Sequence, residues 1–436
     1  MTIVGANTGV YLGVSSPSYA FAHLETKLCR TGVATKSDIS IKDITFTECT
    51  FDQNDVGVYV STNQSLNVSF CVFKGNNYAL NLIPTAQYFQ SITICITKSK
   101  FLQNYQVIVN DPYLFCHVSN LDISIKESIF ENHGGVAFDL SYTYYSCFAL
   151  TANIVIETCS FKNSRIALGL GEATFNLSMT NSVISDVSQT WDTLTFRGRY
   201  QILLVTNTTF LNTSSVIVNT FPLESVTFQN NKFLSSRGTT CIDVTVGTST
   251  EQLTGEIFLT ANEFLNNSVS YVIRVNDLLN INTSLTENIL DNPQSSYELY
   301  VTTPLKVNYA LNAERNYWGG NNRSHVTSRI YDFYDNFQSA IVDIQSIYTD
   351  SRRTDLTDTH TWMEWNSSNV FNGGKLTRNE TLSANFTNNS CINITASIYI
   401  PPNFKLEISG AMTICFLRYV GISAGGNVHV QHVQQI

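Results

Sequence analysis

The chain has 436 residues, of which 43% are hydrophobic and only 14% are charged, and its 25 basic and 34 acidic side chains give a net charge of −9. Ample apolar content with little charge excludes a disordered chain, and the acidic balance leaves no basic footprint for nucleic acid. The sequence contains no run of about 18 apolar residues that would predict a membrane span, and residues 1–14 do not have the pattern of a secretory signal.

A repeat of about 27 residues occupies most of the chain. Each copy contains a large apolar residue, which we call the anchor. The eleven predicted anchors are Phe51, Phe73, Phe101, Phe130, Phe161, Ile184, Phe210, Phe233, Phe264, Leu290 and Trp318.

Columns aligned to the anchor show a period of two. The residue five positions before the anchor is always apolar, as in Phe46 and Ile125, and the residue four positions before it is always polar. This alternation indicates strands and not helices. Two positions before the anchor the column holds small or amide residues such as Cys49 and Asn262, which can hydrogen-bond from one coil to the next. A turn and a second strand follow each anchor.

Short strands and tight turns repeating every 20 to 30 residues are typical of a parallel β-helix. We therefore predict an all-β fold, a parallel β-helix solenoid of about eleven coils over residues 1–318, and we expect right-handed winding by the crossover rule. The framework of a leucine-rich repeat is missing, and the period is too short for a propeller blade.

The pattern changes after Trp318. Residues 319–350 are predicted to cap the rod with a short helix, in which Val326, Ile330 and Phe333 share one face. Residues 351–370 are expected to form a connector, and residues 371–436 to begin a second β-helix unit. Because that unit is only two or three coils deep, we expect the chain to be a piece of something longer.

Two segments carry a family resemblance. The phrases N-Y-W-G and S-R-I-Y-D-F-Y-D between residues 312 and 344, and G-G-K-L and I-Y-I-P between 373 and 422, resemble the repeat junctions of the bark beetle (Anakonda) family of invertebrate tricellular-junction proteins. The resemblance implies a right-handed, pectin-lyase-like parallel β-helix and a large extracellular parent protein with a single membrane anchor. It also implies a role in organising the occluding junction where three epithelial cells meet.

The sequons favour an extracellular location over chance occurrence in a chain rich in Ser and Thr, and the ten cysteines are compatible with an oxidising compartment. None of the N-x-S/T acceptors lies on a predicted inward column. The glycosylation candidates are Asn63, Asn67, Asn176, Asn207, Asn212, Asn266, Asn282, Asn322, Asn366, Asn379, Asn385, Asn388 and Asn393.

Among the ten cysteines, two pairs are disulfide candidates. Cys116 and Cys147 occupy matching loops of consecutive coils, which bring equivalent Cα atoms to about 5 Å. Cys391 and Cys415 are 24 residues apart, roughly one coil. Cys49 and Cys71 share the inward column, where a buried free thiol and a bridge are equally compatible with the sequence.

The sequence offers no constellation that would predict catalysis, a cofactor or a metal site. A polysaccharide hydrolase needs clustered carboxylates, whereas Asp122, Glu127, Glu157 and Asp186 are spread over several coils and are expected to be solvated outward positions. The histidines have no metal-ligand spacing.

One candidate binding surface combines two long loops of consecutive coils. Its aromatic residues suit contact with a protein or glycan partner, although they could instead pack on one another to cover the rod. The candidates are Tyr113, Phe115, Tyr142, Tyr144 and Tyr145.

The sequence and the resemblance together favour a non-enzymatic extracellular scaffold that organises epithelial cell–cell junctions. Its expected partners are other cell-surface or junction proteins and glycans, with no nucleic acid and no membrane span in this chain. The alternative is a secreted carbohydrate-binding or polysaccharide-processing β-helix.

Overall fold

The computed structural model describes most of the chain. The described ranges are 1–13, 16–36, 41–62, 65–84, 90–110, 118–141, 151–169, 174–187, 192–220, 224–246, 255–277, 282–302, 310–336, 339–344, 346–358, 365–367, 370–371, 374–376, 379–383, 392–394, 396–409, 413–417 and 420–431.

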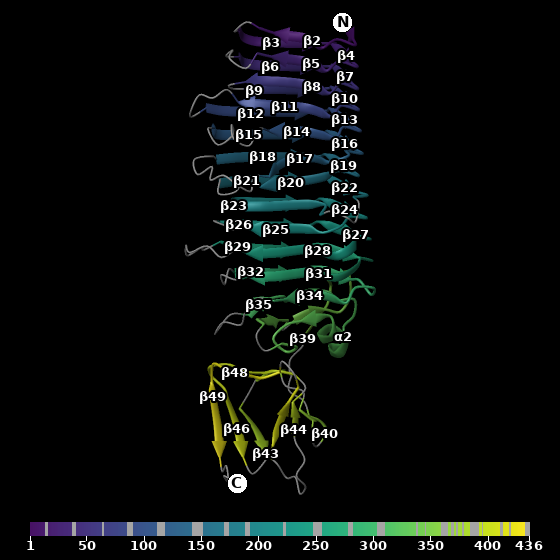
Figure 1. Cartoon of the computed structure of the whole chain (residues 1–436). Helices are drawn as coiled ribbons and strands as arrows, with labels where there is room; N and C mark the ends of the chain where they lie inside the picture. Colours follow the sequence, from purple (N-terminus) through teal and green to yellow (C-terminus); the bar gives the residue numbers. More distant parts are fainter. Residues whose placement is uncertain are drawn as a thin grey trace.

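The chain winds into a parallel β-helix whose three sheets run the length of a rod (Figure 1). Sheet A has the shortest strands and holds the anchors. It consists of β1 (Thr2–Val4), β4 (Glu25–Lys27), β7 (Thr50–Asp52), β10 (Val72–Lys74), β13 (Lys100–Leu102), β16 (Ile129–Glu131), β19 (Ser160–Lys162), β22 (Val183–Ser185), β24 (Thr209–Leu211), β27 (Lys232–Leu234), β30 (Glu263–Leu265) and β33 (Ile289–Asp291).

Sheet B follows sheet A in every coil. It consists of β2 (Thr8–Leu12), β5 (Thr31–Thr35), β8 (Val56–Thr62), β11 (Tyr78–Pro84), β14 (Gln106–Asn110), β17 (Val136–Ser141), β20 (Arg165–Gly169), the first half of β23 (Leu194–Thr206), β25 (Val216–Thr220), β28 (Arg237–Val246), β31 (Ser268–Asp277), β34 (Tyr297–Val301) and β36 (Ile330–Tyr331).

Sheet C closes each coil. It consists of β3 (Ser16–Ala22), β6 (Ile41–Thr47), β9 (Ser65–Ser69), β12 (Gln90–Thr97), β15 (Val118–Lys126), β18 (Thr151–Glu157), β21 (Thr174–Thr180), the second half of β23, β26 (Ser225–Gln229), β29 (Glu256–Thr260), β32 (Asn282–Thr286), β35 (Ala310–Asn312) and β37 (Ile341–Asp343).

The rod begins two coils earlier than the anchors predicted. Sheet A has 12 strands, and its first two precede Phe51, with Ile3 and Thr26 in register with that anchor column. Thr26 is fully buried in the place of an aromatic ring. The stack of about twelve coils confirms the predicted solenoid of about eleven, and the anchors did not mark the first two copies because the aromatic signal is absent from them.

The predicted inward columns form the core. Successive anchor rings stack face to face, with centroids 4.6 Å apart for Phe51 and Phe73 and 4.7 Å apart for Phe130 and Phe161. Trp318 ends this column and is fully buried. The coil spacing of about 4.8 Å matches the preferred separation of stacked rings, so one residue type repeated at one position stabilises many coils.

The strands of sheet A from β4 to β30 are flanked on both sides by corners whose backbone is left-handed. Three residues before the anchors stand Glu48 and Asn207, with φ of 53° and 50°, and two residues after them stand Asn212 and Asn266, with φ of 50° and 55°. Non-glycine residues accept this conformation at a cost of about 1–2 kcal/mol each, which coil stacking offsets. The backbone turns sharply at both corners, and these side chains lie on the outside.

The rod ends under a cap. The helix α2 (Arg323–Ser328) is shorter than predicted, because Ile330 already belongs to strand β36. The three residues predicted to share a helical face, Val326, Ile330 and Phe333, are nevertheless all buried. Hydrophobic burial therefore holds the cap on the last coil, although only Val326 is helical.

A second, smaller β-helical unit follows the cap (Figure 1). Two short strands, β38 (Ser346–Tyr348) and β39 (Leu356–Asp358), pair antiparallel before it, so part of the predicted connector is strand. The unit's three sheets comprise β40 (Trp365–Ser367), β41 (Val370–Phe371), β44 (Ile392–Ile394) and β47 (Ile414–Phe416); β42 (Gly374–Lys375), β45 (Ile398–Ile400) and β48 (Ile422–Ala424); and β43 (Glu380–Ser383), β46 (Lys405–Ser409) and β49 (Asn427–Gln431).

Candidate functional site on the outer face of sheet B

Four tyrosines form a continuous cluster on the outside of sheet B near the cap. Tyr271 lies on β31, Tyr297 and Tyr300 on β34, and Tyr331 on β36. The ring centroids of Tyr271 and Tyr300 are 4.2 Å apart, and those of Tyr300 and Tyr331 are 4.5 Å apart with nearly parallel planes. All four tyrosines are half-buried, so their rings pack against one another and still leave part of each side chain accessible to a partner.

A departure from strict alternation brings two of these rings onto one face. Glu298 and Leu299 are adjacent in sequence, and both are buried. Because two successive residues of β34 point inward, Tyr297 and Tyr300, three positions apart, both face outward, with centroids 5.8 Å apart. Sequence reasoning that assumes a period of two puts them on opposite faces, which is why this cluster was not predicted.

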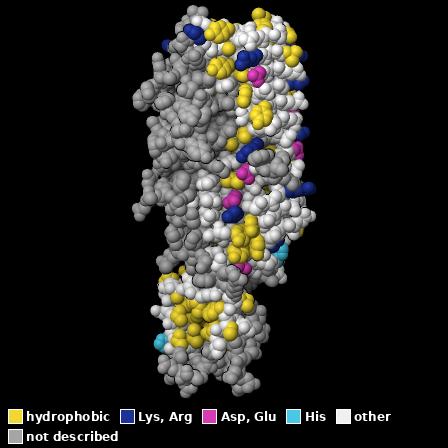
Figure 2. Space-filling model, in the orientation of Figure 1, with side chains coloured by type: hydrophobic (Ala, Val, Ile, Leu, Met, Phe, Trp, Pro, Cys, Tyr) yellow, Lys and Arg dark blue, Asp and Glu magenta, His cyan; other side chains and the backbone are white. Residues whose placement is uncertain are grey.

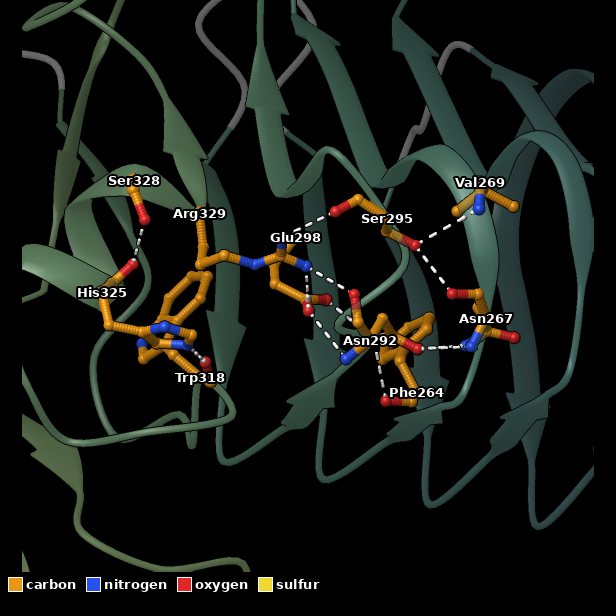
Figure 3. A network of polar contacts seen from close by, with 10 residues as sticks. All are labelled: Phe264, Asn267, Val269, Asn292, Ser295, Glu298, Trp318, His325, Ser328 and Arg329. Carbon is orange, nitrogen blue, oxygen red and sulfur yellow. Dashed lines mark hydrogen bonds and ion pairs between the residues drawn. The ribbon is translucent and has the colours of Figure 1, made fainter.

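Beneath the cluster, a buried carboxylate anchors β34 to the cap (Figure 3). Glu298 Oε1 accepts hydrogen bonds from Asn292 N at 2.9 Å and from Arg329 Nη2 at 2.8 Å. The Arg329 guanidinium also donates to the carbonyl oxygens of Ser295 and Asn292, each at 2.6 Å. Burial raises the pKa of Glu298, while the hydrogen bond from Arg329 opposes that rise. The strand that carries two of the tyrosines is therefore held by charge-assisted hydrogen bonds.

Glu298 also ends a second ladder of buried amides, which lie three positions after the anchors except at Asn292, two positions after Leu290. Asn267 Nδ2 donates to Asn292 Oδ1 at 2.8 Å, and Asn292 Nδ2 donates to Glu298 Oε2 at 2.7 Å. His133 occupies the same column, and burial lowers its pKa to about 4. This ladder was missed, although Asn54, Asn76 and Asn104 repeat in register and could have revealed it.

The predicted ladder two positions before the anchors is confirmed. Asn262 Nδ2 donates to Asn288 Oδ1, and Asn288 Nδ2 donates to Asn316 Oδ1, both at 3.0 Å. Cys49 and Cys71 in the same column are buried free thiols, so they do not form a bridge.

Eight of the nine predicted binding and disulfide residues cannot be compared with the structure. Tyr113, Phe115, Tyr142, Tyr144 and Tyr145 lie outside the described residues, as do Cys116, Cys147 and Cys391. Cys415 is disulfide-bonded, and its partner lies outside the described residues because the six other described cysteines are free. Both predicted pairings stay predictions.

Ten of the sequon asparagines lie within the described ranges. Of these, seven are exposed, and Asn67 and Asn176 are half-buried. The exposed ones are Asn207, Asn212, Asn266, Asn282, Asn322, Asn379 and Asn393. Asn366 lies in strand β40, and the other three candidates, Asn63, Asn385 and Asn388, are outside the described part of the chain. None of the nine whose burial is described is fully buried.

The four carboxylates expected to face solvent do so, and each interacts with a neighbouring coil. Glu157 pairs with Lys126 at 2.9 Å, and Glu127 with Lys98 at 3.7 Å. Asp122 accepts from Asn153 at 2.8 Å and Asp186 from Asn212 at 3.1 Å. These carboxylates therefore continue the coil-to-coil ladders on the outside of the rod.

The fold and this surface define a class, a β-solenoid whose side chains repeat in ladders inside and outside. No protein-family model, curated protein or solved structure matches the chain. None of the helices in the described part of the chain has the length and apolar character needed to cross a membrane.

Proposed function

We propose that this chain is a non-enzymatic extracellular scaffold that organises contacts between epithelial cells, as the bark beetle resemblance implies. One observation carries the proposal: an unbroken stack of about twelve coils whose described sequon asparagines avoid the core. At about 4.8 Å per coil the stack is roughly 55 Å long. A rod held by buried ring stacks and amide ladders keeps its length under load, which suits a spacer between surfaces.

The outer surface supports the same role. The carboxylates predicted to be outward bind neighbouring side chains, as in the pair of Lys126 and Glu157. Tyr300 and Tyr331 stack on each other with an interplanar angle of 15°, so the ring faces that a sugar would use are partly occupied. Ring edges and hydroxyls are left for a partner, which favours protein contact over the alternative of carbohydrate binding.

The test is to express the chain behind a heterologous secretion signal in insect cells. We expect secretion, glycopeptides at Asn207, Asn212 and Asn266, and clustering of beads coated with the protein. Asn→Gln variants at these three exposed positions serve as controls for the glycan assignment. Retention in the cell without glycans, or secreted protein that leaves beads dispersed, would overturn the proposal. Shortening of an acidic polysaccharide would instead favour the alternative.

A further inference from the structure

Neither sheet A nor sheet B has a sequon on its strands, and sheet B, with its longer strands, is the broader of these two faces. None of its strands, from β2 to β36, contains an N-x-S/T acceptor. By contrast, Asn67, Asn176 and Asn282 lie on strands of sheet C. Asn207 lies at the corner between sheets C and A, and Asn212 and Asn266 lie at the corner between sheets A and B. If the chain is glycosylated as the proposed function requires, sheet B offers the broadest surface whose own strands carry no glycan.

The middle of this face carries opposite charges on adjacent coils. Asp243 is in register with Arg274, and Arg274 with Tyr300. Arg274 Nη1 lies 3.4 Å from Asp243 Oδ2, with about a third of the arginine side chain exposed. In the same column of sheet B, Ile217 is paired with Asp243 from the preceding coil, and Tyr331 is paired with Tyr300 from the following one. Figure 2 shows hydrophobic side chains gathered over β31 and β34, next to charged ones.

We infer that sheet B binds the sheet B face of a second copy of this chain, with the two rods antiparallel. The twofold axis of this dimer lies in the interface, perpendicular to the rods and midway between the coils of Asp243 and Arg274. It brings each Asp243 opposite the other copy's Arg274. The same axis brings Tyr300 opposite Ile217, an aromatic ring against a β-branched side chain. A parallel pair would instead place Asp243 against Asp243, so charge selects the antiparallel pair.

A second copy also fits the spacing of this face. Side-chain columns on the rod repeat at about 4.8 Å, and another rod presents the same repeat, so contacts recur from coil to coil. Six coils, three on each side of the axis, by five residues cover roughly 480 Å² per partner, which is in the range of weak interfaces. The dimer is therefore weak in solution and gains strength only when many copies act together.

The experiment is sedimentation velocity of the secreted, glycosylated chain from 5 to 500 μM. We expect a concentration-dependent dimer that Arg274→Asp abolishes and that the double reversal Asp243→Arg with Arg274→Asp restores. The double variant rebuilds the charge pair with its signs exchanged. The matched control, Glu157→Lys on sheet C, should leave the dimer unchanged, and circular dichroism reports whether each variant is folded.

A glycan introduced into the proposed interface, here called the glycan wedge, provides an independent test. Ile217→Asn with Asn219→Thr creates a sequon at the centre of sheet B and should leave only monomer. A wild type that stays monomeric at 500 μM, or a dimer that survives the occupied wedge, would overturn the inference. If the protein is secreted, glycosylated and clusters beads but does not dimerise, only this inference is contradicted. If the protein dimerises but is retained in the cell without glycans, only the proposed function is contradicted.

Discussion

The rod and the second unit are built on the same plan but differ in how far the described residues cover their last coil. In the rod, Trp318 closes the anchor column, and Val326 of the cap is fully buried in the same core cluster. In the second unit, Val428 and Val430 of β49 are 43% and 52% exposed, although they are in register with the core positions Leu406 and Ile408. The comparison teaches that an inward position is buried only when another coil or a cap covers it.

The largest effect should come from breaking the ring stack in the middle of the rod. Phe130 stacks on Phe101 and Phe161, at 4.9 and 4.7 Å. Replacing it with alanine should lower the free energy of unfolding by about 4 kcal/mol, through lost transfer energy and a cavity. Urea denaturation followed by circular dichroism measures the loss. Val430→Ala in the second unit is the control, and equal losses for the two variants would contradict the comparison.

Breaking the ion pair beneath the tyrosine cluster should cost slightly less. Arg329→Met leaves the Glu298 carboxylate buried and unpaired, which lowers stability by about 3 kcal/mol. Because the pKa of Glu298 then rises further, the loss should be greater at pH 8 than at pH 5. Adding Glu298→Gln should recover most of the stability and remove the pH dependence. Failure of the second substitution to recover either would show that the charge is not the cause.

A pH dependence should arise at the junction between the two regions. Burial raises the pKa of Asp332 to about 8 and also raises that of Asp335. The folded state holds these protons more tightly, so stability should fall as pH rises from about 4 to about 8. Asp332 lies two residues from Tyr334, whose carbonyl accepts from Ser397 N at 3.3 Å. Urea midpoints at pH 5 to 8 should show a smaller slope for Asp332→Asn, and an unchanged slope would refute the assignment.

The smallest effect should come from the outer ladders of the rod. Glu157 is exposed beside Lys126, and screening by solvent leaves such pairs little influence on stability. Glu157→Gln should therefore leave the urea midpoint unchanged within error at 0.15 M salt. A shift comparable to that of Phe130→Ala would mean that the outer ladders, and not the ring stack, hold the coils together.

Much of this molecule follows from local sequence pattern. Period-two columns determined the strands, the anchors determined sheet A from Phe51 onward, and small or amide residues two positions earlier determined a buried ladder. These features could be predicted because a solenoid places the same position of every repeat in the same environment. The residue types in one column therefore indicate whether that position is buried or exposed.

Other features depended on how distant parts of the chain meet. The tyrosine cluster exists because Glu298 and Leu299 both point inward, as Val272 and Ile273 do in the preceding coil. The buried charge of Glu298 is paired only by Arg329 of the cap, 31 residues away. Thr26 is buried only because the neighbouring coils cover it. A period-two rule cannot anticipate a buried charge whose partner lies in another element, since the desolvation cost is offset only once the tertiary structure brings the two together.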